Sequence, residues 1–181
     1  MIFKKLSEWP SSKILKIMLI IGFALSFAVI PVMQYFTQLS GFPAEIFSSQ
    51  LSFSGTLMKS FYALTDITLY RIAPSLDYIF MTGYGLILFS SALIVARRYR
   101  TSSLLQKEGF IVALSGVIAA CCDAIENVFI LLMLTDPTGF PDYWAITHSV
   151  FALVKWILLV IVIIWVIFFL IISLIKGKST D

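Results

Sequence analysis

The sequence predicts an all-α membrane protein built as a bundle of four transmembrane helices, and three observations support this prediction. Of 181 residues, 60% are hydrophobic and 13% charged, and the mean hydropathy is +0.98, whereas about 25% of a soluble domain is charged. Four apolar stretches approach or exceed the roughly 20 residues that cross a bilayer. Most basic residues lie near the start of the first stretch, between the second and third stretches, or after the fourth. The spans, each helical because hydrocarbon offers the backbone no other partner, cover residues 14–33, 76–96, 110–134 and 145–175.

The first span is expected to start after a serine N-cap at Ser11 or Ser12. Pro31 is expected to bend or end it, since proline interrupts helical hydrogen bonding. Lys4 and Lys5 before an apolar run are also typical of a secretory signal. The run is long for such a signal, so we expect an uncleaved first span.

The longest connection, residues 37–73, is predicted to contain an amphipathic helix over residues 57–72. Apolar residues recur there at three- and four-residue spacing, which is typical of one helical face. The helix is expected to lie on the outer membrane surface or to cap the mouth of the bundle; packing on its own protein is an equal alternative. The predicted apolar face consists of Leu57, Phe61, Leu64, Thr68 and Ile72.

Prolines and a glycine mark the start of the second span and the connection between the third and fourth spans. Pro74 suits the first turn of the second span, where the helix dipole favours the carboxylate of Asp77. Residues 135–142 hold two prolines and a glycine, which predict a tight turn between antiparallel third and fourth spans.

The length of the chain leaves no room for a separate soluble domain, so residues 1–181 are expected to form one domain.

The distribution of basic residues predicts the topology. Ten of them lie before the first span or in its first turn, between the second and third, or after the fourth, and only Lys59 and Arg71 lie on the other side. The positive-inside rule therefore predicts a multi-pass protein of the cytoplasmic membrane with both termini in the cytoplasm. The same residues are expected to touch anionic membrane lipids, and a nucleic-acid partner is not expected. The ten residues are Lys4, Lys5, Lys13, Lys16, Arg97, Arg98, Arg100, Lys107, Lys176 and Lys178.

Three ionisable residues lie well inside the predicted spans and form the main functional lead. Asp123 and Glu126 lie in the third span and Lys155 in the fourth. A charge in hydrocarbon costs at least a few kcal/mol, so each needs an internal partner. Asp123, Glu126 and Asn127 share one helical face through their three- and four-residue spacing. Small residues such as Gly116 continue that face, which is therefore expected to point into the bundle.

The tight turn predicts that these residues meet at a common depth. At about 1.5 Å per residue, Asp123 and Lys155 lie at similar distances from the turn, and Glu126 falls between His148 and Lys155. Asp77 and His148 are expected at the outer mouth, and Tyr84 is expected to line the same recess. The sequence thus predicts a polar pocket that opens outward or towards the outer leaflet.

The chemistry of this pocket is narrowed by what the sequence lacks. The single histidine excludes a three-histidine zinc centre and a bis-histidine haem, and neither a metal nor a cofactor is expected. Glu126, Asp123 and His148 are candidate acid/base groups, and Asn127, Lys155, Asp77 and Tyr84 are candidate binding residues.

The favoured hypothesis is that the protein binds or processes a lipid-like, hydrophobic or amphiphilic molecule, with enzyme and carrier equally weighted. The alternatives are a proton- or cation-coupled transport element, and a structural protein whose ion pair only fixes helix packing. A homo-oligomer is compatible with each of these.

Overall fold

A computed structural model describes residues 2–100 and 103–178, with side chains up to Ile175, so Lys176 and Lys178 of the charge argument lie outside the described side chains. All regular secondary structure in these residues is helical, and four helices are long and apolar enough to cross a membrane. The predicted all-α four-helix class is therefore confirmed. The helices are α1 (Ile2–Glu8), α2 (Ser12–Leu39), α3 (Ile46–Gln50), α4 (Gly55–Tyr62), α5 (Ile67–Tyr70), α6 (Ile72–Ala96), α7 (Leu104–Met133) and α8 (Asp142–Lys178).

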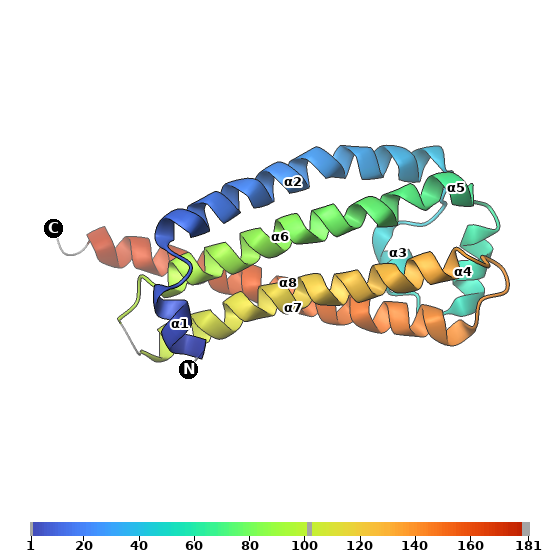
Figure 1. The fold of residues 1–181 in the computed structure, drawn as a ribbon. Coiled ribbons are helices and arrows are strands. Elements are labelled where there is room, and N and C mark those ends of the chain that lie inside the picture. The colour runs from blue at the N-terminus through green and yellow to red at the C-terminus, as the bar shows by residue number, and fades with distance from the viewer. Residues whose placement is uncertain (1, 101–102, 179–181) are drawn as a thin grey trace.

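The four long helices pack mainly in chain order. Helix α2 packs along α6, α6 along α7, and α7 along α8, with a smaller contact between α6 and α8 (Figure 1). Within the described residues, α2 makes no comparable contact with α7 or α8. Helices α6, α7 and α8 therefore all contact one another, whereas α2, in the described part of the chain, packs mainly against α6 and not against α8.

Small residues allow α2 and α6 to approach closely. A Cβ atom on Gly22 would lie 2.6 Å from the carbonyl oxygen of Gly83, and one on Gly83 would lie 2.6 Å from the hydroxyl of Ser26. Such small side chains let backbones pack by van der Waals contact where lipid provides no hydrophobic driving force. The α2–α6 pair is thus held by backbone proximity near the middle of both helices.

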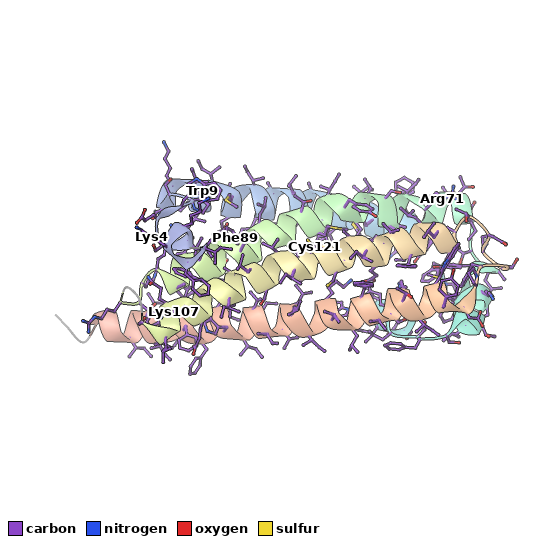
Figure 2. The ribbon with its side chains drawn as sticks, turned by 60° about the horizontal axis from the view of Figure 1, so that its bottom comes forward. Lys4, Trp9, Arg71, Phe89, Lys107 and Cys121 are labelled. Atoms are coloured by element: carbon purple, nitrogen blue, oxygen red, sulfur yellow. The ribbon has the colours of Figure 1, made fainter. Side chains whose placement is uncertain are left out.

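The two ends of the bundle differ in their loops. One end, the loop end, carries α3, α4, α5 and the turn between α7 and α8, and the other, the terminal end, carries α1 and both termini (Figure 1). Lys4 and Lys107 lie at the terminal end, Arg71 at the loop end, and Cys121 between them (Figure 2). Arg97 anchors α1 at the terminal end, because its guanidinium donates to the carbonyls of Leu6 and Pro10.

Helix α2 is longer than predicted. It continues through Pro31 to Leu39 instead of ending near residue 33. The backbone of Asp66, at the start of α5, donates to the carbonyl of Ser40, which ties the loop to this extended helix end. The other three long helices also begin or end a few residues beyond the predicted spans, as is usual for helix boundaries.

The prediction of one helix over residues 57–72 is wrong. Helix α4 ends at Tyr62 and α5 starts after Asp66, whose carboxylate caps it by accepting from the Leu69 amide. The buried face also differs, because Leu64 is 73% exposed whereas Met58 and Tyr62 are each 1% exposed. A break of four residues turns the chain, so the periodicity that runs across it does not describe a continuous face.

Candidate functional site

Helices α7 and α8 bring three charged groups together in the interior. The ammonium of Lys155 lies 2.8 Å from Asp123 Oδ1 and 2.6 Å from Glu126 Oε2, and all three side chains are at most 4% exposed. The tight turn after Met133 sets this register, as the chain spacing predicts. The single ammonium thus contacts both carboxylates, and the formal charge of the group is −1 when all three are ionised.

Tyrosines on α6 extend this charged group. The hydroxyl of Tyr84 donates to Asp123 Oδ2 at 2.8 Å and also lies 3.3 Å from the carbonyl of Ala119. One turn and a half earlier, the hydroxyl of Tyr78 donates to the carbonyl of Ala124 at 3.2 Å. Hydrogen bonds between helices satisfy polar groups that lipid cannot, so α6, α7 and α8 all contribute to holding Asp123.

Nearer the loop end, a second polar pair joins α6 to α7. Asn127 donates through Nδ2 to Asp77 Oδ2 at 2.5 Å. Asn127 is 2% exposed, whereas Asp77 is half-buried. A carboxylate has room for about four hydrogen bonds, and this is the single one that Asp77 makes within the described residues. Its second oxygen is therefore free to accept from a bound molecule.

His148 on α8 lies beside Glu126 with an incomplete hydrogen-bond set. Its Nε2 atom is 3.7 Å from Glu126 Oε1, and the Nδ1 atom has no hydrogen-bond partner among the described residues, although the residue is 1% exposed. Glu126 Oε1 also lacks a hydrogen-bond partner among the described residues, whereas Oε2 lies 2.6 Å from the ammonium of Lys155. Buried polar atoms are normally paired, so this site retains unused hydrogen-bonding capacity.

A cavity of about 540 Å³ reaches this polar region from the loop end. Its walls come from the last turns of α2, from α3 and α4, from the first turns of α6, and from α7 and α8. The polar residues that line it next to the charged group are Asp77, Asn127 and His148. Asp123, Glu126, Lys155 and Tyr84 are not among its described lining residues and lie behind this wall.

Several lining residues were not predicted from the sequence. The end of α2 supplies Gln34 and Gln38, α3 supplies Gln50, and α4 supplies Tyr62. The hydroxyl of Tyr62 has no hydrogen-bond partner although the residue is 1% exposed. The four-residue spacing of Gln34 and Gln38, at the end of an otherwise apolar span, is a signal that identifies one of these walls.

The first loop is fixed against α8 by three contacts. Trp156 donates through Nε1 to Gln50 Oε1 at 2.8 Å, and its ring lies 4.9 Å from that of Phe47. The amide of Phe53 donates to the hydroxyl of Ser149 at 3.1 Å. These contacts hold α3 over α8, which positions Gln50 and Tyr62 at the cavity.

No protein-family model matches the chain, and no curated protein or solved structure shows significant similarity to it. The function is therefore argued from the geometry. In the described part of the chain, no three His, Cys, Asp or Glu side chains are placed so that they hold a metal ion. The protein is a membrane-type helical bundle with buried charged residues.

The structure separates the candidate residues into those that line the cavity and those that lie behind its wall. Of the predicted acid/base groups, His148 lies on the cavity wall, whereas Asp123 and Glu126 lie behind it. Asp77 and Asn127 line the cavity as expected. The expectation that Tyr84 lines it is wrong, because its hydroxyl points to Asp123. The catalytic and binding roles of these residues stay predictions.

Proposed function

We propose that this protein binds a lipid-like amphiphile in the cavity at its loop end. The observation that carries the proposal is a cavity of about 540 Å³ in which apolar side chains share the wall with Asp77, Asn127 and His148. Small-molecule pockets typically measure about 300–1,000 Å³ and combine apolar walls with a few convergent polar groups. The polar group of the ligand would face these three residues, and its hydrocarbon would contact Met33, Phe42, Ile46 and Ile130.

The packing of the helices supports access from the membrane. Helices α2 and α8 both contribute to the cavity wall, yet they make no extensive contact with each other in the described residues. The segment around α3 follows α2 in the chain and contacts α8. A molecule dissolved in the membrane would thus reach the cavity between two helices without crossing the aqueous phase.

The terminal half of the bundle supports binding over conduction. Towards the termini, the interior is filled by an apolar cluster that includes Leu15, Leu88, Leu93, Phe110 and Val162, each at most 8% exposed. An ion path through this half would require polar or hydrated walls. The transport alternative predicts a proton or cation flux in proteoliposomes that Asp123→Asn abolishes, and the absence of flux would remove it.

An enzymatic role for the same cavity is the second candidate, favoured by one contact. Glu126 Oε1 lies 3.7 Å from His148 Nε2, and Nδ1 has no hydrogen-bond partner among the described residues. A carboxylate beside a histidine is the arrangement found in catalytic triads, where the histidine acts as a general base. Conversion of a bound molecule, detected as a mass change, that Glu126→Gln abolishes without loss of binding would favour the enzyme. Retention of an unchanged molecule would favour the carrier.

For the topology, we propose that the protein lies in the cytoplasmic membrane and that its terminal end faces the cytoplasm. The support is the excess of basic residues at this end, illustrated by Lys4 and Lys107 opposite Arg71 (Figure 2). A fusion of green fluorescent protein to the C-terminus is expected to fluoresce, and a fusion of alkaline phosphatase at the same position is expected to be inactive. The reverse pattern would invert the proposed orientation.

Native mass spectrometry of the protein released from neutral detergent tests the binding proposal. We expect a co-purified amphiphile, and we expect Ala44→Trp to lose it because residue 44 lines the cavity and the indole would fill it. Ala63→Trp is the matched control, since residue 63 is exposed at the same end and does not line the cavity. Equal retention by the two variants would contradict the proposal.

A further inference from the structure

The charge of the cavity wall is of one sign. Among the described lining residues, Asp77 is the one acidic side chain, and neither lysine nor arginine contributes to the wall. Behind the wall, two carboxylates share the single ammonium of Lys155. The cavity and its support therefore contain more negative than positive charge, in surroundings where water screens little.

Two unpartnered polar groups mark the position of a ligand independently of this charge. Tyr62 and His148 line the cavity, each is 1% exposed, and the Tyr62 hydroxyl and His148 Nδ1 lack hydrogen-bond partners among the described residues. Leaving a buried polar atom unpaired is costly, so a molecule that reaches either group and supplies the missing bond would be stabilised. They come from α4 and α8, on two different walls of the cavity.

The free hydrogen-bonding atoms beside the charged group are mainly acceptors. Asp77 has one oxygen left after accepting from Asn127. If His148 directs its Nε2 proton to Glu126, its Nδ1 atom carries a lone pair. The Tyr62 hydroxyl acts in either direction. A head group with several N–H donors and a positive charge complements this set, whereas a phosphate or carboxylate head presents further acceptors and negative charge.

We infer that the amphiphile carries a cationic amine head, which binds the free oxygen of Asp77 and contacts His148 and Tyr62. This inference rests on the proposed function and narrows it to one class of ligand. The tail lies along the apolar lining supplied by α2, α3 and α7. The ammonium would neutralise the carboxylate that the protein itself leaves without a basic partner.

A competition among three single-chain amphiphiles of equal length tests this inference. Dodecylamine, dodecanol and sodium dodecyl phosphate are offered in equal amounts to the full-length protein in neutral detergent at pH 7, and the bound species are counted by native mass spectrometry. We expect the amine to bind about tenfold more tightly than the alcohol, because one desolvated charge pair distinguishes them, and the phosphate to bind least.

Substitutions assign the preference to Asp77. We expect Asp77→Asn to reduce amine binding about tenfold and to leave alcohol binding within about twofold. Glu45→Gln is the matched control, because it removes an exposed carboxylate at the same end that makes no side-chain capping hydrogen bond. This control is expected to keep the preference for the amine. An unchanged preference in Asp77→Asn would overturn the assignment to Asp77.

Different results would contradict the head-group inference and the binding proposal. Alcohol or phosphate bound as tightly as the amine would overturn the head-group inference and leave the binding proposal standing. If the cavity-filling variant Ala44→Trp retains all three amphiphiles as the wild type does, the binding proposal itself fails. If Asp77→Asn does not fold, the competition with the wild-type protein still decides the inference, since it needs no variant.

Discussion

The two halves of the bundle meet near the level of Asp123 and Lys155. They are formed by the same long helices but differ in the side chains that fill their interiors. In the terminal half, apolar side chains fill the interior and glycines allow close approach. In the loop half, a second apolar cluster is accompanied by buried charged side chains and by a cavity with Asp77, Asn127 and His148 in its wall. Polar groups in lipid are costly to maintain, so we expect the loop half to carry the function.

The largest effect is expected when the charged group of the loop half is broken. Lys155→Met leaves Asp123 and Glu126 buried without their shared ammonium. Removing one partner of a buried ion pair costs about 3–5 kcal/mol, so the free energy of unfolding in mixed micelles should fall by that amount. Denaturation with sodium dodecyl sulfate, followed by circular dichroism, measures it.

The matched variant for this test neutralises the whole group. Adding Asp123→Asn and Glu126→Gln to Lys155→Met removes the uncompensated charge, and most of the lost stability should return. A triple variant as unstable as the single one would show that shape, and not charge, is what Lys155 contributes.

In the terminal half, a change of packing should lower stability without touching the ligand. A Cβ atom on Gly109 would lie 2.5 Å from both Ala96 Cβ and the ring of Trp165. Gly109→Leu should therefore cost about 1–3 kcal/mol through overpacking, while native mass spectrometry shows unchanged retention of the amphiphile. Loss of the ligand in this variant would break the division between the two halves.

A smaller effect is expected where the halves meet. Tyr84→Phe removes the hydroxyl that donates to Asp123 and keeps the ring that packs against Phe80. Hydrogen bonds between membrane helices contribute about 1 kcal/mol, so the unfolding free energy should fall by about that much. Tyr78→Phe, which loses a bond to a backbone carbonyl, is the control and should cost less. Equal costs would show that the charge of Asp123 adds nothing.

The smallest effect is expected at the surface of the loop half. Lys59 and Asp142 form an ion pair at 2.7 Å, but their side chains are 28% and 60% exposed. Exposed pairs contribute about 0.2–1 kcal/mol and are screened by salt. Lys59→Met should therefore change stability by less than about 1 kcal/mol, and less again in high salt. A larger loss would assign the α4–α8 contact a greater part in holding the loop.

The sequence predicted the half of the site that lies on two consecutive helices. The spacing of Asp123 and Glu126 defines one face of α7, and the tight turn that follows places Lys155 at the same depth. Local geometry decides both facts, since helical rise and a short turn leave little freedom. The same reasoning identified Asp77 and His148 near the loop end, where both line the cavity.

The opposite wall of the cavity depends on contacts that are distant in sequence, and the sequence did not predict it. Gln50 reaches its position because Trp156, more than a hundred residues later, donates to it. Phe53 adopts a positive φ of 49° in the turn between α3 and α4, a conformation that no pattern at this residue indicates. The break between α4 and α5 likewise follows from capping by Asp66 and from the bond to Ser40.

Pro31 divides α2 into a fixed and a bendable segment. It has no N–H to donate to the carbonyl four residues before it, so the helix is weakest there. The crossing at Gly22 and Gly83 lies before this point, whereas all four α2 residues at the cavity lie after it. We therefore expect a bend of α2 at residue 31 to move its four cavity-lining residues together, while the ion pairs between α7 and α8 stay intact.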